Sequence, residues 1–264
     1  MISDFFLALL LALIQGLTEF LPVSSSAHLL FPSLLFGTKD FGIVFDISVH
    51  AGTLAAVIYY FKKEIQGLFY AWNPLTKTRS KEDFSLGLHL IVATLPIILL
   101  GFILSDLTES RSANINSIAW ANLIFAGLLY VAFKTSSQSK SITELTLFAA
   151  LIIGCFQALA VFPGASRSGM AITGALIIGL NIKDTSRFAF LLSIPTIMGA
   201  LMLMLAKGAY SIALSDMLIM LTGFIGSSLI AFFTIKSFLQ FVEKIGMIPF
   251  VLYRVALGLV LLLI

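Results

Sequence analysis

Residues 15–30 read QGLTEFLPVSSSAHLL and place a carboxylate, three consecutive serines and a histidine inside a long apolar region. Proline and serine interrupt residues 4–36 near their middle, so this region does not read as one straight helix. A broken backbone inside a membrane is tolerated where protein or a wet cavity satisfies its free N–H and C=O groups. The stretch therefore predicts a re-entrant hairpin that carries polar groups into the protein interior.

The composition places this hairpin in a membrane. Of the 264 residues, 59% are hydrophobic and 11% are charged, which is more apolar surface than a soluble core can hide. The first residues carry no basic flank and no small-residue cleavage site, so we expect them to stay in the mature protein. A formal net charge of +3 fits topology signals better than nucleic-acid binding. We therefore expect an all-α, polytopic integral membrane protein that binds no nucleic acid.

Six further apolar segments are long enough to be spanning helices, because about 20 residues cross the hydrocarbon layer. They fall at about residues 42–61, 86–105, 115–133, 188–206, 212–235 and 247–264. Residues 143–180 are again interrupted by proline, glycine and serine, which predicts a second re-entrant hairpin. The expected fold is six spanning helices plus two broken hairpins in a single membrane domain.

The two breaks resemble each other. Gln15 is followed by a proline–serine break, and Gln157 is followed by another, which makes Ser25 and Ser166 equivalent. We infer an internal duplication, with residues 1–135 as one half and residues 143–264 as the other. A chance match between two apolar segments is the alternative explanation.

Basic residues orient the two halves through the positive-inside rule. The basic residues assigned to the cytoplasmic side are Lys62, Lys63, Lys77, Arg79, Lys81, Lys134, Lys140, Lys183, Arg187, Lys236 and Lys244. Those assigned to the outer side are Lys39, Arg111 and Lys207. On this count the first hairpin enters from outside and the second from inside, which is an inverted repeat whose half-sites meet near the midplane.

Arg167 lies in the second break, VFPGASRSGMAITG at residues 161–174, where a charged side chain is costly to place. Its guanidinium fork suits a phosphate, and the hydroxyls of Ser166 and Ser168 are further donors for the same oxygens. A helix beginning near Ser168 would add its N-terminal dipole. We therefore expect an anion site, with a structural ion pair to Glu19 or Asp46 as the alternative.

The first break holds the candidate acid, nucleophile and base. Glu19 lies four residues after Gln15, on the same helix face, and is a candidate ligand for a divalent cation or a general base. A buried carboxylate satisfied by nearby serines is the structural alternative. Ser24, Ser25 and Ser26 precede His28, so a hydroxyl and an imidazole are candidates for nucleophile and base, for two phosphate donors, or for a helix N-cap.

Two other ionisable positions lie within apolar segments. Asp46 and His50 are four residues apart in FDISVHAGT, residues 45–53, where such a pair marks either a site or a structural bond. Arg254, near the C-terminal end, is expected to pair with Glu243 or to extend its charge toward the membrane surface.

The motifs at residues 15–29, 45–53 and 163–169, in this order, resemble those of the integral-membrane undecaprenyl-diphosphatases, the bacitracin-resistance family of bacteria. The resemblance covers nearly the whole chain and includes GCFQALAVFPG at residues 154–164 and MIPFVLYR at residues 247–254. It implies hydrolysis of undecaprenyl diphosphate to undecaprenyl phosphate and inorganic phosphate. It also implies a requirement for Mg²⁺ or Ca²⁺ and an active site that faces the outer side of the cytoplasmic membrane.

The family's functional positions fall on residues of both breaks. The resemblance places the family's acidic motif on Gln15 and Glu19, its serine and histidine on Ser25 and His28, and its arginine motif on Ser166, Arg167 and Ser168. We predict Glu19, Ser25, His28 and Arg167 as catalytic residues, with Glu19 also the metal ligand. The predicted substrate contacts are Gln15, Ser24, Ser26, Ser166, Ser168 and His50. In many family members the position of Gln15 is a glutamate, and Ala27 stands where a glycine is common. Our hypothesis is attack by Ser25 with His28 as base, with direct attack by His28 or by water as alternatives.

A polyprenyl-phosphate transporter is the main competing function, because inverted repeats with broken helices are typical of secondary transporters. The concentration of nucleophile, base and acid candidates around one anion site favours an enzyme. The expected partners are a polyprenyl diphosphate lipid and the membrane, with a homodimer as a further candidate assembly.

Overall fold

The structure is a computed structural model that describes residues 2–75, 80–104, 114–207 and 214–263. Lys77, Arg79 and Arg111, which contribute to the charge count above, lie outside these residues. The helices in chain order are α1 (Ile2–Thr18), α2 (Ser25–Phe36), α3 (Ile43–Tyr60), α4 (Lys62–Trp72), α5 (Lys81–Ile103), α6 (Ile115–Thr135), η2 (Ile142–Glu144), α7 (Leu147–Ala158), η3 (Leu159–Val161), α8 (Arg167–Ile178), α9 (Ile182–Lys207), α10 (Leu214–Ile245) and α11 (Ile248–Leu262). The all-α, polytopic membrane architecture is confirmed.

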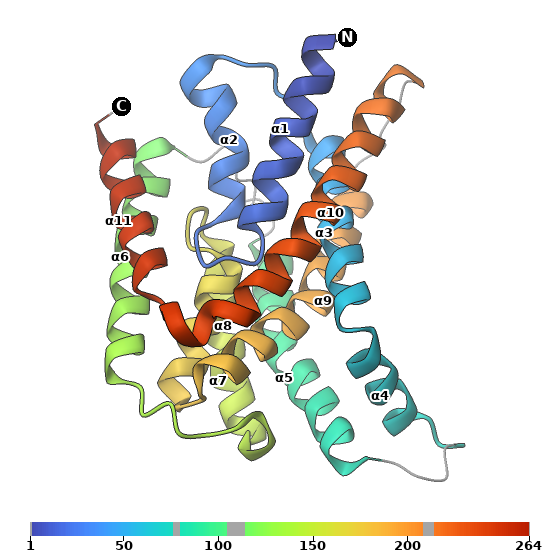
Figure 1. The fold of residues 1–264 in the computed structure, drawn as a ribbon, viewed down its shortest axis with the longest axis vertical. Helices are drawn as coiled ribbons and strands as arrows, with labels where there is room; N and C mark the ends of the chain where they lie inside the picture. Colours follow the sequence, from blue (N-terminus) through green and yellow to red (C-terminus); the bar gives the residue numbers. More distant parts are fainter. Residues whose placement is uncertain (1, 76–79, 105–113, 208–213, 264) are drawn as a thin grey trace.

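Five helices in the described residues, α3, α5, α6, α9 and α10, are long and apolar enough to cross a membrane. The sixth predicted span, residues 247–264, forms the 15-residue α11, which is too short to cross the hydrocarbon layer alone. The reason lies in the preceding helix. The 32-residue α10 runs obliquely past the middle of the protein, and the chain turns at Gly246, so α11 starts well inside the molecule (Figure 1).

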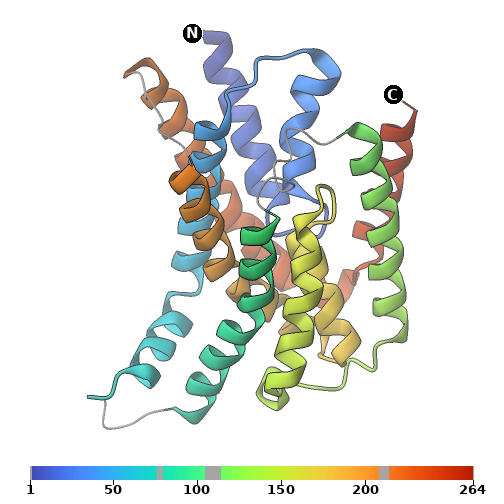
Figure 2. The same cartoon turned by 180° about the vertical axis from the view of Figure 1, so that it is seen from behind.

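The two hairpins enter from opposite ends. The α1–α2 pair descends from the end that holds the N-terminus, whereas α7–α8 rises from the end that holds α4 and the α6–α7 connection (Figures 1 and 2). Their breaks meet near the middle of the protein. The end with α4 includes Lys62 and Lys63, which lie in the first turn of that helix.

The two breaks share one backbone geometry. Each ends in a serine with positive φ, Ser24 at 73° and Ser166 at 71°, and each is followed by a helix of 12 residues. Each of these helices ends at a glycine in the left-handed region, Gly37 or Gly179. The structural counterpart of Ser166 is thus Ser24, one residue before the predicted Ser25, because the first break has one residue fewer between proline and serine. Ser25 consequently matches Arg167.

Glycines let the hairpin helices approach their neighbours closely. A Cβ on Gly16 of α1 would lie 2.7 Å from the Ile230 Cβ of α10, and one on Gly154 of α7 would lie 2.5 Å from the Ala93 carbonyl oxygen of α5. Phe20 follows α1, is fully buried, and packs edge-to-face on Phe190 of α9. These contacts hold the first break against the second half of the chain.

Candidate functional site

An ion pair joins the two breaks. Arg167 Nη2 donates to Glu19 Oε1 at 2.5 Å, although the residues are 148 positions apart in the sequence. Glu19 is 7% exposed, and the Arg167 side chain is 13% exposed. The structural pairing considered as an alternative for Arg167 therefore exists, and it lies at the predicted anion site. The predicted anion site and the alternative ion pair with Glu19 therefore lie at the same place in the protein.

The second carboxylate oxygen of Glu19 collects the polar groups of the first half. Its Oε2 accepts hydrogen bonds from Ser25 Oγ at 2.5 Å and from Gln15 Nε2 at 2.9 Å. The His50 Nε2 lies 3.8 Å from the same oxygen. Glu19 is therefore the centre of a cluster that contains Gln15, Ser25, His50 and Arg167, all of which were predicted as site residues.

The other serines line the same cavity in two ways. In the second break, Ser166 Oγ accepts from the Gly169 N–H at 3.2 Å and so caps α8, while Ser168 Oγ donates to the Leu21 carbonyl at 2.8 Å. Ser168 thereby ties the second break to the first. In the first break, the hydroxyls of Ser24 and Ser26 are 3.5 Å apart, and Ser24 makes no side-chain capping bond to α2. These two hydroxyls remain available to a ligand's oxygens.

His28 faces away from Ser25. Its Nδ1 lies 2.7 Å from the Ser24 carbonyl, which can only accept a hydrogen bond, so Nδ1 carries the proton. Its Nε2 lies 2.5 Å from the Tyr253 hydroxyl, and a neutral ring accepts from that hydroxyl. Both ring nitrogens are engaged, and the residue at hydrogen-bond distance from Ser25 is Glu19. The hypothesis that His28 is the base for Ser25 thus has no contact to support it.

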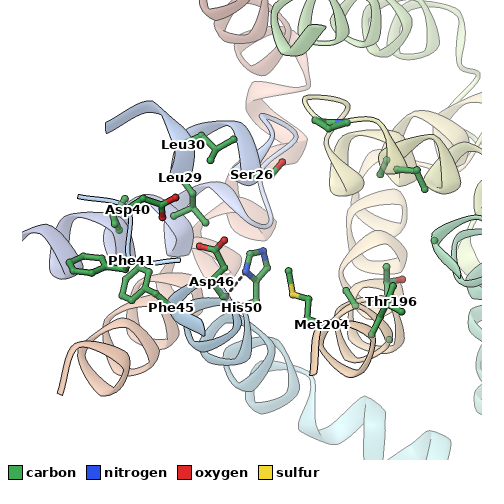
Figure 3. A pocket seen from close by; sticks show the side chains of 18 of the residues that line it. Ser26, Leu29, Leu30, Asp40, Phe41, Phe45, Asp46, His50, Thr196 and Met204 are labelled. Atoms are coloured by element: carbon green, nitrogen blue, oxygen red, sulfur yellow. Dashed lines mark hydrogen bonds between the residues drawn. The ribbon is translucent and has the colours of Figure 1, made fainter. Parts of the chain in front are cut away.

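His50 reaches the cluster from α3. Its Nδ1 bonds the backbone carbonyl of Asp46 at 2.7 Å, one helical turn earlier, which directs Nε2 toward Glu19 (Figure 3). The His50 ring lies at the wall of a pocket, with Asp46 and Phe45 on the same helix and Met204 across from it. Asp46 and His50 therefore form part of the site wall, as one of the two predicted alternatives had it.

The ion pair lines the smaller of two neighbouring cavities. A cavity of about 210 Å³ contains Glu19, Ser25 and Arg167, and a cavity of about 700 Å³ lies beside it. The larger cavity has an apolar wall formed by residues such as Leu29, Phe41, Phe45, Ile98 and Leu203. Ser26, His50 and Thr196 line both cavities. The shared lining residues place the two cavities side by side.

The cluster offers few groups of its own to a cation. Within the residues that the structure describes, no set of three or more His, Cys, Asp or Glu side chains is placed to hold a metal. However, the Gln15 Oε1 is buried beside Glu19 with no hydrogen-bond partner. A carboxylate and a free amide oxygen fit a hard cation that completes its coordination with water and substrate phosphate oxygens.

Two residues of α11 at the site were missed or misplaced by the sequence reasoning. Arg254 does not pair with Glu243 or extend toward the surface. It is 0% exposed, and its Nη2 donates to the carbonyls of Gly164 and Ala165 at 3.0 Å each. Tyr253 contacts His28. A signal existed for Arg254, since an arginine inside an apolar segment marks a structured interior contact.

Comparison with known proteins gives one consistent result. A family model described as bacitracin resistance protein BacA matches residues 8–260. A protein of Saccharophagus degradans named undecaprenyl-diphosphatase is 44% identical over 97% of this chain and 96% of its own length. Proteins of the same name from Teredinibacter turnerae and Alcanivorax borkumensis are 43% and 42% identical, and each match covers 98% of both chains.

Proposed function

Because this chain belongs to the bacitracin resistance protein BacA family, we propose that it hydrolyses undecaprenyl diphosphate to undecaprenyl phosphate and inorganic phosphate. It is a multi-pass membrane enzyme, a phosphatase of the lipid carrier used in cell-wall synthesis. The observation that carries the proposal is the Glu19–Arg167 pair, formed where two broken hairpins meet beside a large apolar cavity. The transporter alternative is not favoured, since the relatives are named for hydrolysis.

The two cavities match the two chemical parts of the substrate. The small cavity presents the Arg167 guanidinium, which binds phosphate oxygens in a bidentate fashion, together with hydroxyls of Ser24, Ser26 and Ser168. The adjoining apolar cavity suits the first isoprene units of the lipid, with the rest of the tail in the bilayer. A diphosphate at Arg167 would compete with Glu19 for the guanidinium and release the carboxylate.

Ser25 is the nucleophile that the geometry supports best. Its Oγ would attack the terminal phosphorus while the bond to the bridging oxygen breaks and undecaprenyl phosphate leaves. The Ser25 proton would pass to Glu19 Oε2, to which it is already hydrogen-bonded at 2.5 Å. Glu19 would pass this proton to the departing undecaprenyl phosphate, which restores its carboxylate. Water would then attack the phosphoserine, and Glu19 would take the water proton and return it to Ser25 Oγ as inorganic phosphate leaves. Arg167 would stabilise the negative charge of the transferring phosphoryl group in both steps.

A divalent cation is the cofactor we propose, as Mg²⁺ or Ca²⁺. Gln15 Oε1 and Glu19 are the protein atoms that would hold it, together with the substrate phosphates. When bound, such a cation supplies charge neutralisation at the phosphate oxygens. Gln15 itself keeps Glu19 in place through its Nε2 hydrogen bond.

We propose that the site opens to the outer side of the bacterial cytoplasmic membrane. The larger cavity is lined by Thr38, Lys39 and Asp40, which lie in the connection between α2 and α3. This connection is at the end of the protein opposite to α4 and its lysines. The positive-inside rule places the lysine-rich end in the cytoplasm, so the cavity mouth faces outward.

Replacing Ser25 by alanine should lower kcat for phosphate release about 10³-fold, because the nucleophile is lost and water must attack directly. Ser24→Ala is the matched control, since it removes a neighbouring hydroxyl that has no bond to Glu19. A phosphoserine trapped by acid quench in the wild type and absent from Ser25→Ala would agree with this step. A loss below tenfold in Ser25→Ala would instead assign the attack to water.

Replacing Gln15 by glutamate should lower the Mg²⁺ concentration for half-maximal activity about tenfold, because a second carboxylate beside Glu19 raises the local negative charge. The measurement is the Mg²⁺ dependence of phosphate release at saturating substrate. Gln157→Glu, at the matching position of the second hairpin, is the control. An unchanged Mg²⁺ dependence in Gln15→Glu would show that residue 15 does not bind the cation.

A further inference from the structure

Two consecutive residues of α11 each hold one of the two breaks. Tyr253 contacts His28 in the hairpin formed by α1 and α2, and Arg254 contacts the backbone of the hairpin formed by α7 and α8. Neither residue lines the cavities that contain Glu19 and Arg167. Their partners are His28 and the carbonyls of Gly164 and Ala165, which neighbour the proposed reacting groups in the sequence.

Arg254 fixes the backbone just before Arg167. Its Nη2 donates to the carbonyl oxygens of Gly164 and Ala165 at 3.0 Å each. The next residue, Ser166, has a φ of 71°, which is uncommon for a residue other than glycine. The buried guanidinium of Arg254 holds both carbonyl groups in a fixed direction. It thereby fixes the orientation of the backbone that leads into Ser166 and Arg167.

The space around Arg254 is built for its guanidinium. A Cβ on Gly169 would come 3.0 Å from Arg254 Nη1, so the glycine in the first turn of α8 leaves room for the side chain. Two donors, Nε and Nη1, have no hydrogen-bond partner in the described structure. Burying an arginine with unsatisfied donors is costly, so a purely space-filling role would be better served by an apolar residue.

Tyr253 fixes the opposite break through His28. The hydroxyl lies 2.5 Å from His28 Nε2, and the two rings stack with centroids 5.6 Å apart and an angle of 13°. Because His28 Nδ1 bonds the carbonyl of Ser24, the imidazole connects α11 to the positive-φ serine that precedes Ser25. The contact therefore reaches the residue next to the proposed nucleophile.

We propose that Tyr253 and Arg254 are positioning residues that hold Ser25 and Arg167 in register across the two hairpins. The proposal rests on the hydrolytic function assigned above. A cluster of Ala27 on α2, Ile118 and Ala119 on α6, and Leu261 on α11 packs α11 against both neighbours and makes it a rigid support. Because one helix bears both contacts one residue apart, a displacement of either break would change the distance between the nucleophile and the guanidinium.

The test uses the full-length protein in detergent with undecaprenyl diphosphate as substrate. Arg254→Met should keep the fold and lower kcat about 30-fold, because the guanidinium of Arg167 loses its orientation. Arg254→Lys should recover about a third of the wild-type kcat, since one ammonium reaches the two adjacent carbonyls. Arg187→Met, a charge removal at the Glu64 pair far from the site, should leave kcat unchanged.

Coupling to Arg167 separates positioning from a general loss of stability. If Arg167→Lys costs about 100-fold alone, independent effects in the double variant with Arg254→Met would cost about 3000-fold. The proposal predicts a double-variant loss close to that of Arg167→Lys alone. Tyr253→Phe, which removes one hydroxyl and leaves packing intact, should lower kcat about tenfold. It tests the same positioning role at the first break if Arg254→Met does not fold.

The results distinguish a failure of the positioning role from a failure of the hydrolytic function. Full activity in folded Arg254→Met and in Tyr253→Phe, or multiplicative losses with Arg167→Lys, would overturn the positioning role while wild-type phosphate release persists. Absence of phosphate release from the wild type would instead overturn the hydrolytic function on which this role depends.

Discussion

Replacing Glu19 by glutamine should lower kcat/KM for phosphate release about 10⁴-fold, because one substitution removes the proposed base, the cation ligand and the partner of Arg167. The amide has nearly the same shape as the carboxylate, so the packing around residue 19 is kept. Glu19 Oε2 accepts hydrogen bonds from Ser25 and Gln15, and an amide nitrogen in its place could not accept them. The measurement is steady-state phosphate release at several Mg²⁺ concentrations.

Glu64→Gln is a matched control, since Glu64 forms a loose 3.9 Å pair with Arg187 outside the cluster. This control should retain wild-type activity. Full activity in Glu19→Gln together with an unchanged Mg²⁺ dependence would remove Glu19 from both the cation site and the proton transfer.

Arg167→Ala should lower kcat about 10⁴-fold, a loss comparable with that of other arginines that stabilise a transferring phosphoryl group. The substitution also leaves Glu19 buried without its cationic partner, which destabilises the site before substrate binds. Circular dichroism and thermal unfolding should be recorded beside the kinetics, so that loss of function is separated from loss of fold.

Arg167→Lys distinguishes charge from geometry at this position. Lysine keeps the positive charge but lacks the planar fork that binds two phosphate oxygens together, so we expect an intermediate loss of about 100-fold. Equal activity of Arg167→Ala and the wild type would show that the anion site lies elsewhere.

The parts of the fold and the site that depend on local chemistry were predictable from the sequence. Proline and serine inside apolar segments predicted both breaks, and the cost of Arg167 in a membrane predicted an anionic partner. Glu19 was one of the two partners considered, and the structure places it there. Lysine-rich connections predicted the orientation of the two hairpins, which enter from opposite ends.

The contacts that depend on long-range packing were not predictable. His28 follows Ser25 by three residues, so the sequence suggested a nucleophile–base pair, but the first turn of α2 directs the ring to Tyr253. The apolar segment around Arg254 signalled an interior contact, but its partners, the carbonyls of Gly164 and Ala165, lie about 90 positions away and could not be identified from the sequence. The one-residue displacement of Ser24 against Ser166 reflects a shorter loop, which a motif comparison does not resolve.

The division into halves at residues 1–135 and 143–264 stays a prediction, as does a homodimer. The matching φ angles of Ser24 and Ser166, and the two 12-residue helices that follow, support the duplication.

The most direct test of the central claim is the stoichiometry of products formed from undecaprenyl diphosphate by the purified wild-type protein, with Mg²⁺ present or chelated. We predict one inorganic phosphate and one undecaprenyl phosphate for each substrate consumed, with the reaction lost on chelation and restored by added Mg²⁺. Absence of phosphate release with any divalent cation would contradict the account, and the protein should then be tested for transport of the lipid phosphate.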